Sequence, residues 1–205
     1  MDELLIAANK PVRIRPTFCH FAASQRSTLM KIQLSPFVHS YPAPAVLIGC
    51  GSVSQPNIIA CSWFGTVCSE PPMVSVSVRE SRFSYHLIHE SREFTANMPR
   101  VGDLNIVKYC GTKSGSEVNK FKELGLVPLP CPPLKSAPMI AECFLVLACK
   151  VRHELHLGSH HIFIADVVSV HCDENVRRPS KSPDPCPAEQ MVYLDGKFWT
   201  LKPIE

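Results

Sequence analysis

The chain has 205 residues, of which 45% are hydrophobic and 19% charged, a composition that is typical of one globular domain with a full core. The net charge is only +3 and the basic residues are spread along the chain, which argues against a nucleic-acid-binding protein. No apolar run is long enough to cross a bilayer and no secretory signal is recognised, so we expect a cytoplasmic protein with no membrane partner.

Cysteines are frequent but isolated. The ten cysteines include no C-x-x-C pair, the close spacing on which zinc sites and thioredoxin-like redox motifs depend. We therefore expect reduced thiols and no metal site. Residues 1–30 are predicted to form an N-terminal extension that is disordered or loosely docked, and residues 31–205 to form the folded domain.

The first half of the chain predicts short strands and short helices. Apolar runs and alternation indicate strands, while spacing of three to four residues indicates helices. Ser84 is expected to be the N-cap of the first helix, and Gly125 to close the last. The predicted strands are Val46–Val53, Ile58–Phe64, Met73–Val78 and Glu93–Asn97, and the predicted helices are Ser84–His89, Val101–Tyr109 and Asn119–Leu124.

The second half predicts longer strands. A proline-rich extended loop over Pro128–Pro138 precedes strands at Glu142–Leu157 and His160–His171, because proline disfavours helices and central strands. A polar loop over Asp173–Glu189 leads to a closing hairpin of Met191–Leu194 and Lys197–Leu201. The pattern predicts a mainly β fold, a barrel or sandwich with helical excursions, and the absence of G-x-G-x-x-G disfavours a dinucleotide-binding Rossmann fold.

Two segments indicate an anion site. Ser81-Arg-Phe-Ser84 follows a predicted strand and begins a helix, a position where hydroxyl groups, backbone N–H groups and a guanidinium can meet a phosphate. Taken alone, this segment is more often a helix cap with an exposed arginine. Lys113-Ser-Gly-Ser116 with Lys120 is, by itself, a flexible loop with solvated lysines. The two segments together favour a phosphorylated cofactor.

Aromatic and histidine residues provide a weaker signal. Trp63 and Phe64 are neighbours on a predicted strand, so one is expected in the core while the other can stack on a planar ring. Four histidines lie between residues 153 and 161, but in a strand–turn–strand pattern without H-E-x-x-H, which disfavours a metal. One histidine beside a redox ring is the preferred interpretation.

These motifs, in this order, resemble the flavin reductase-like, FMN-binding split-barrel family and its flavoredoxin-like branch, over about residues 35–201. The motifs are Pro56-Asn57, Ser62-Trp63, Gly65–Met73, Ser75–Arg79, Ser81–Tyr85, Cys110-Gly111, Val118-Asn-Lys-Phe121 and Leu157–Val167. The resemblance implies a six-stranded Greek-key split barrel that forms a homodimer, with FMN near the subunit interface. Ser116 and Asn119 replace an arginine and an aspartate that the family commonly has, which weakens one expected phosphate or pyridine-nucleotide contact.

The resemblance also implies roles for individual residues. The phosphate would be bound by Ser81, Arg82, Ser84 and Lys120, with Phe121 in the same motif; the isoalloxazine ring would be lined by Asn57, Ser62, Trp63 and Thr66. His160 matches the histidine near the reactive side of the flavin and is the expected catalytic residue. Tyr193, Phe198 and Trp199 would cover the ring from the closing hairpin.

The implied function is that of an FMN-dependent oxidoreductase that takes electrons from NADH or NADPH and reduces a flavin, a ferric complex or a redox protein partner. An FMN-containing electron carrier without significant NAD(P)H activity is the alternative. A third hypothesis is a split barrel whose pocket takes another ligand. Because the flavin carries the electrons, neither of the first two hypotheses requires an acid–base pair in the protein.

Overall fold

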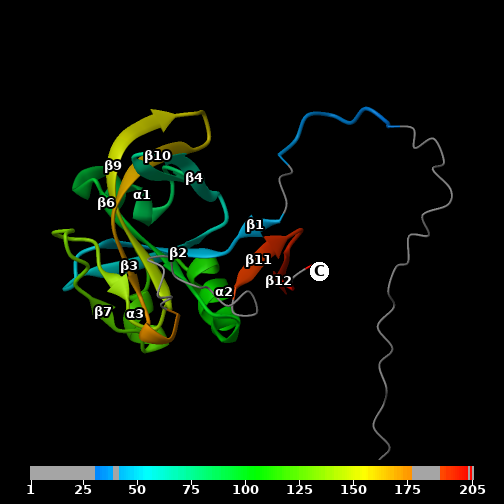
Figure 1. Ribbon diagram of the computed structural model, residues 1–205. Coiled ribbons are helices and arrows are strands. Elements are labelled where there is room, and N and C mark those ends of the chain that lie inside the picture. The colour runs from blue at the N-terminus through cyan, green and yellow to red at the C-terminus, as the bar shows by residue number, and fades with distance from the viewer. Residues whose placement is uncertain (1–30, 39–41, 177–189, 203, 205) are drawn as a thin grey trace, which may run out of the picture. The chain divides into compact units, whose positions relative to one another are not determined.

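The computed structural model describes residues 31–38, 42–176, 190–202 and 204 (Figure 1). The expected extension over residues 1–30 lies outside these ranges. The chain divides into two compact units, residues 1–38 and 39–205. In the first, residues 31–38 form neither helix nor strand. The second contains all the elements described below.

A seven-stranded antiparallel sheet forms the body of the second unit. In spatial order its strands are β3 (Pro56–Cys61), β2 (Val46–Gly51), β6 (Glu93–Met98), β9 (Leu145–His156), β10 (His161–Cys172), β5 (Pro72–Val78) and β4 (Phe64–Ser69). The mainly β fold is therefore confirmed. The sheet is not closed, since β3 and β4 are its two edges.

The strand count differs from the six that the resemblance implies. The predicted strand Ile58–Phe64 ends at Cys61, and Phe64 instead begins β4, which pairs with β5. Thr66 and Val67 are both exposed, although neighbours on a strand point to opposite faces. β4 therefore lacks the apolar alternation by which strands are recognised in a sequence.

The β9–β10 hairpin determines where the site lies. Its strands have 12 residues each, and register shifts at Ile164/Ala165 and Val167/Ser169 mark bulges, which bend strands and increase their twist. β10 also pairs with β5, and His161 lies opposite Val78. The residues just beyond this pair, His160 and Arg79, are thereby placed at one end of the sheet.

Three short helices, α1 (Phe83–Ser91), α2 (Leu104–Thr112) and α3 (Lys120–Leu124), accompany the sheet, and a 3₁₀ turn (Val101–Asp103) precedes α2. The Asn119 side chain caps α3 by accepting from Lys122 N at 3.0 Å, and Gly125 closes α3 with φ of 66°. The predicted helix boundaries there are confirmed. The predicted N-cap of α1 is wrong, because Arg82 occupies that position and Ser84 is buried inside the helix.

Smaller elements complete the unit. β11 (Met191–Leu194) and β12 (Lys197–Thr200) form the predicted closing hairpin, and β1 (Ala43–Pro44) pairs with β11. The predicted proline-rich loop contains β7 (Pro128–Leu129), which pairs with β8 (Met139–Ile140). The predicted loop Asp173–Glu189 begins with a 3₁₀ turn (Glu174–Val176), and its remainder lies outside the described residues.

The buried apolar residues form two clusters. One includes Val46, Ile48 and Phe163 with Ile88 of α1, and the other includes Leu47 and Ile58 with Phe121 of α3. Alternate residues of β2 thus belong to different clusters, as expected for a strand that is buried on both faces. Within the described parts of the chain, no helix is long and apolar enough to span a membrane.

Candidate functional site

A hollow with three adjoining lobes lies along β3. Ala60 and Arg82 line all three lobes, so the lobes are neighbours along this strand. The anion lobe, about 110 Å³, lies between α1 and the loop that follows α2; the tryptophan lobe, about 230 Å³, contains Trp63 and His160. The hairpin lobe, about 640 Å³, lies between α2 and the β11–β12 hairpin and is large enough for a cofactor-sized ring system.

The lining of this hollow has a strong excess of positive charge. Its basic residues are Arg79, Arg82, Lys108, Lys113 and Lys120. No aspartate or glutamate of the described chain lines any of the three lobes. A hollow of this kind favours an anionic ligand, because cations and helix N-termini stabilise negative charge.

Lys120 is a buried cation of the anion lobe. The side chain is 3% exposed, and its ammonium donates to the carbonyl oxygens of Ile58 at 2.6 Å and Cys110 at 3.1 Å. Burial lowers the pKa of Lys120, although nearby thiols oppose this. An ammonium has three N–H donors, so one remains for a ligand after the two carbonyls are satisfied.

The N-terminus of α1 forms the opposite wall. Ser81, Arg82 and Ser84, the residues expected at a phosphate, all line the anion lobe, together with Lys113 of the second predicted segment. Arg82 and Ser81 are exposed, whereas Ser84 is buried. The first N–H groups of a helix have no partner inside it, so they add donors to this wall. The two segments that predicted an anion site are therefore brought together.

Asn57 lies behind this lobe and lines none of the three. It is 4% exposed, and its side-chain Nδ2 donates to Ser84 Oγ at 2.8 Å. Phe121, 2% exposed, packs in the core, and Thr66 is exposed on β4 and also lies outside the lobes. The resemblance associates Asn57, Phe121 and Thr66 with the cofactor, but in this chain none of the three lines the hollow.

Trp63 and His160 flank the tryptophan lobe, where Ser62 also lies. Their rings are 4.4 Å apart between centroids at an interplanar angle of 30°, and Ser159 Oγ lies 2.8 Å from His160 Nδ1. Burial lowers the pKa of His160, and the charge of Arg79 lowers it further. The imidazole is therefore neutral near pH 7, able to donate one hydrogen bond and accept another.

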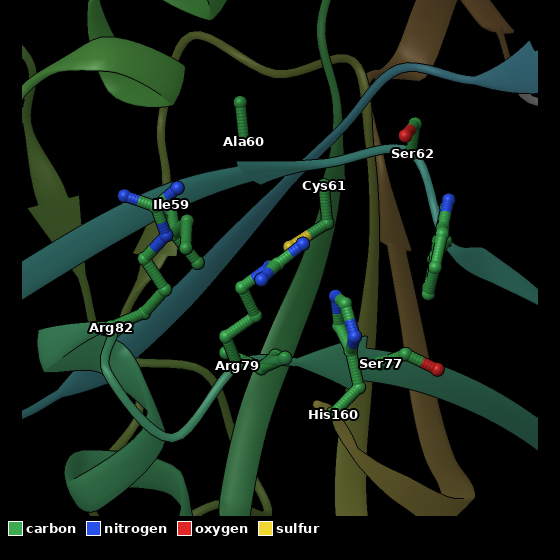
Figure 2. A pocket seen from close by; sticks show the side chains of 10 residues that line it. Ile59, Ala60, Cys61, Ser62, Ser77, Arg79, Arg82 and His160 are labelled. Carbon is green, nitrogen blue, oxygen red and sulfur yellow. The ribbon is translucent and has the colours of Figure 1, made fainter. Parts of the chain in front are cut away.

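Arg79 is a site residue that the sequence analysis did not identify. Figure 2 shows Arg79 and His160 pointing into the tryptophan lobe, with Cys61 at its wall. Arg79 also lines the hairpin lobe. The sequence signal was available, since Arg79 directly follows the alternating strand and precedes Ser81, but its proximity to His160 depends on the pairing of β5 with β10.

The hairpin lobe combines aromatic and basic residues. Tyr193 and Phe198 line it, with centroids 5.3 Å apart in an edge-to-face arrangement, and Val107 and Lys108 of α2 lie opposite. Trp199, also predicted to cover the cofactor, is 53% exposed and does not line this lobe.

Comparison with known families shows which family this chain matches. Residues 38–202 match the family described as "Flavin reductase like domain". The chain belongs to the flavin reductase-like family.

Solved structures of the flavin reductase-like fold agree with this assignment. The chain is 29% identical to the flavoredoxin of Desulfovibrio vulgaris (Miyazaki F), with a TM-score of 0.78 over 86% of this chain and 96% of that one. The flavoredoxin from Methanosarcina acetivorans is also 29% identical, with a TM-score of 0.78 over 86% and 94% of the two chains.

A curated relative carries the name of an enzyme component. It is the reductase component of the 4-nitrophenol 4-monooxygenase/4-nitrocatechol 2-monooxygenase of Rhodococcus opacus, 27% identical over 50% of this chain and 51% of the relative. The match thus spans about half of that flavin reductase-like protein's own length.

Proposed function

We propose that the chain binds FMN in the three-lobed hollow and acts as an oxidoreductase, moving electrons from NADH or NADPH to a flavin, a ferric complex or a protein acceptor. The observation that carries this proposal is the anion lobe, where a buried ammonium, a helix N-terminus and three serines converge without any carboxylate. Ala60 and Arg82 of this lobe also line the two lobes that contain aromatic rings.

The residues present fit this cofactor. Lys120, Ser84 and the N-terminus of α1 would hold the phosphate, and Arg82 and Lys113 would supply further positive charge. Residues of the tryptophan and hairpin lobes would orient the flavin ring. When bound, FMN would supply the hydride and single-electron chemistry that protein side chains lack.

His160 would act on this chemistry through hydrogen bonding. Its pKa is lowered by burial and by Arg79, so it offers a neutral imidazole at the wall of the tryptophan lobe. Arg79, in the same lobe, would stabilise negative charge that develops on a reduced ring.

We also propose, as the resemblance implies, that the protein acts as a homodimer.

Both the solved structures and the curated relative support flavin chemistry. Two similar structures are flavoredoxins, and the Rhodococcus relative is a reductase component.

The second candidate function is an FMN-containing electron carrier without significant NAD(P)H activity. Trp63 favours it, because this side chain is 45% exposed beside His160 and offers a contact for a redox protein at the mouth of the lobe.

The visible absorption spectrum of the purified protein tests both candidates. We expect flavin bands near about 370 and 450 nm, with prompt loss of the 450 nm band after anaerobic addition of NADH or NADPH. Bands that persist with NAD(P)H but disappear with dithionite would identify the electron carrier. A protein that stays colourless after incubation with FMN would refute FMN binding and leave the split-barrel fold with another ligand.

A further inference from the structure

Asn57 connects the elements that build the anion lobe. From β3, its Nδ2 donates to Ser84 Oγ on α1 at 2.8 Å and to Cys50 Sγ on β2 at 3.4 Å. The loop after α2 packs against the same amide, since a Cβ added to Gly115 would lie 2.1 Å from Asn57 Oδ1. Asn57 is thus buried at the junction of α1, β2, β3 and this loop.

Cys50 determines which way the amide group faces. Its S–H donates to the main-chain oxygen of Asn57 at 3.8 Å, which uses the single hydrogen of the thiol. The sulfur can therefore only accept from the side chain of Asn57, and the amide must present its NH₂ group to Cys50 and Ser84. Both hydrogens of that group are then engaged.

This arrangement leaves Ser84 with a hydrogen to donate. A hydroxyl group has one hydrogen, and the Ser84 oxygen already accepts from Asn57. The Cys50 sulfur is a competing acceptor for this hydrogen. Burial raises the pKa of Cys50 to about 11, although Asn57 and Ser84 oppose this, so at neutral pH it is an uncharged thiol and a weak acceptor. A phosphate oxygen in the anion lobe is a much stronger acceptor.

We propose that Asn57 is a positioning residue that makes the Ser84 hydroxyl a hydrogen-bond donor toward the phosphate of FMN, without touching the cofactor itself. The inference rests on the proposed function, because it requires FMN phosphate in the anion lobe. It replaces the role that the resemblance implied for Asn57 at the isoalloxazine ring.

Comparing FMN with riboflavin isolates the effect, because riboflavin has the same ring without the phosphate. The dissociation constants of both would be measured by flavin fluorescence for the wild type, Asn57→Ala, Ser84→Ala and the double variant. We expect each single change to weaken FMN binding by about 10- to 100-fold and riboflavin by less than about 3-fold, since one charge-assisted bond is lost. The double variant should be no weaker than the weaker single variant, because both changes remove the same bond.

Asn57→Asp provides a second, nearly isosteric test. Its carboxylate would accept from Ser84 instead of donating to it, turning the hydroxyl away from the lobe, and would add a negative charge. FMN binding should fall further than in Asn57→Ala, again with riboflavin little changed. If Asn57→Ala does not fold, Asn57→Asp tests the positioning role by itself. Unchanged FMN affinity in Asn57→Asp would overturn the proposal.

Asn97→Ala is the matched control. Asn97 is another fully buried asparagine, bonded to Leu47 O, Thr95 and Ile140 N and lining none of the lobes. We expect it to lower the melting temperature and leave the ratio of the FMN and riboflavin constants unchanged. Asn57 would be a structural residue only if Asn57→Ala weakened FMN and riboflavin binding equally. The same would follow if the fold-loss of FMN affinity in the double variant were the product of the two single losses. A wild type that binds riboflavin as tightly as FMN would instead refute the phosphate site of the proposed function.

Discussion

Lys120 is held in an environment that opposes its charge. The side chain is 3% exposed and its burial lowers its pKa, while two carbonyl oxygens stabilise the ammonium. A buried charge is costly unless it is paired or hydrogen-bonded, so a third acceptor such as phosphate would improve its environment. Arg82, by contrast, is exposed and adaptable.

Replacing Lys120 should therefore reduce FMN affinity strongly. We expect Lys120→Met to weaken binding by about 10- to 100-fold, since a hydrogen bond to a charged group contributes about 1.5–3 kcal/mol. Arg82→Ala should cost less, and the combined variant should lose several-fold more than either. Fluorescence titration with FMN measures this. Lys122→Met, an exposed neighbour on α3 outside the lobes, is the control, and wild-type affinity in Lys120→Met would remove Lys120 from the phosphate site.

At the scale of elements, Glu93 attaches the proline-rich loop to β6. Its carboxylate accepts from Lys135 N, Ser136 N and Ser136 Oγ at 2.8–3.2 Å. Burial would raise the pKa of Glu93, but the hydrogen bonds from Ser136 and Lys135, with Lys150, lower it below its usual 4.5 overall. The loop is therefore attached most firmly when Glu93 is charged.

This shift predicts how stability depends on pH. Because the folded-state pKa is lower than the unfolded one, the contribution of Glu93 is complete above about pH 4.5 and is lost as the pH falls through the lower folded value. Glu93→Gln should reduce the free energy of unfolding by about 1–3 kcal/mol at pH 7. The difference in the free energy of unfolding between Glu93→Gln and the wild type should become smaller as the pH falls toward about 3.

Urea unfolding at both pH values measures the effect of Glu93→Gln. Glu90→Gln, on the exposed face of α1, is the control and should change little. A difference between Glu93→Gln and the wild type that is the same at both pH values would contradict the assignment.

For the whole molecule, cofactor binding should be coupled to folding. The walls of the hollow come from α1, α2, β3, the β5 end and the closing hairpin, so they are brought together only in the folded chain. FMN at 100 times its dissociation constant should stabilise the fold by about 2.7 kcal/mol. For a chain of this size that raises the melting temperature by about 5–10 °C.

Thermal unfolding with FMN or riboflavin at equal concentrations measures this coupling. We expect the larger shift with FMN, because only FMN occupies the anion lobe. Equal shifts would show that the phosphate contributes nothing, and the absence of any shift would contradict a flavin site.

The parts of the fold that the sequence predicted are those with local signals. The end of α3 at Gly125 and the closing hairpin around Asp195-Gly196 depend on residues adjacent in sequence. The N-cap role predicted for Ser84 was wrong, because Arg82 occupies that position and Ser84 instead pairs with Asn57, 27 residues away. β4 and Arg79 were missed for a related reason, since only pairing with other strands defines their positions.

The same distinction applies to the candidate site. The two segments of the anion lobe could be identified because serine, arginine and lysine beside a helix start favour an anion when both segments are taken together. Whether Phe121 faces a ligand or the core depends on the orientation of α3 against β3, which no local pattern specifies. Asn57 is likewise only three residues before Ala60, yet one is behind the hollow and the other lines all three lobes.

The bond between Lys120 and the Ile58 carbonyl also has a consequence for solubility. β3 is an edge of an open sheet, and free peptide groups along such an edge can recruit a strand from another chain. Here α2 and α3 contact β3, and the ammonium of Lys120 occupies a carbonyl of that strand. The lysine that would recognise a cofactor thus also satisfies a carbonyl of this edge, which leaves β3 with fewer free peptide groups for a strand of another chain, with or without a ligand.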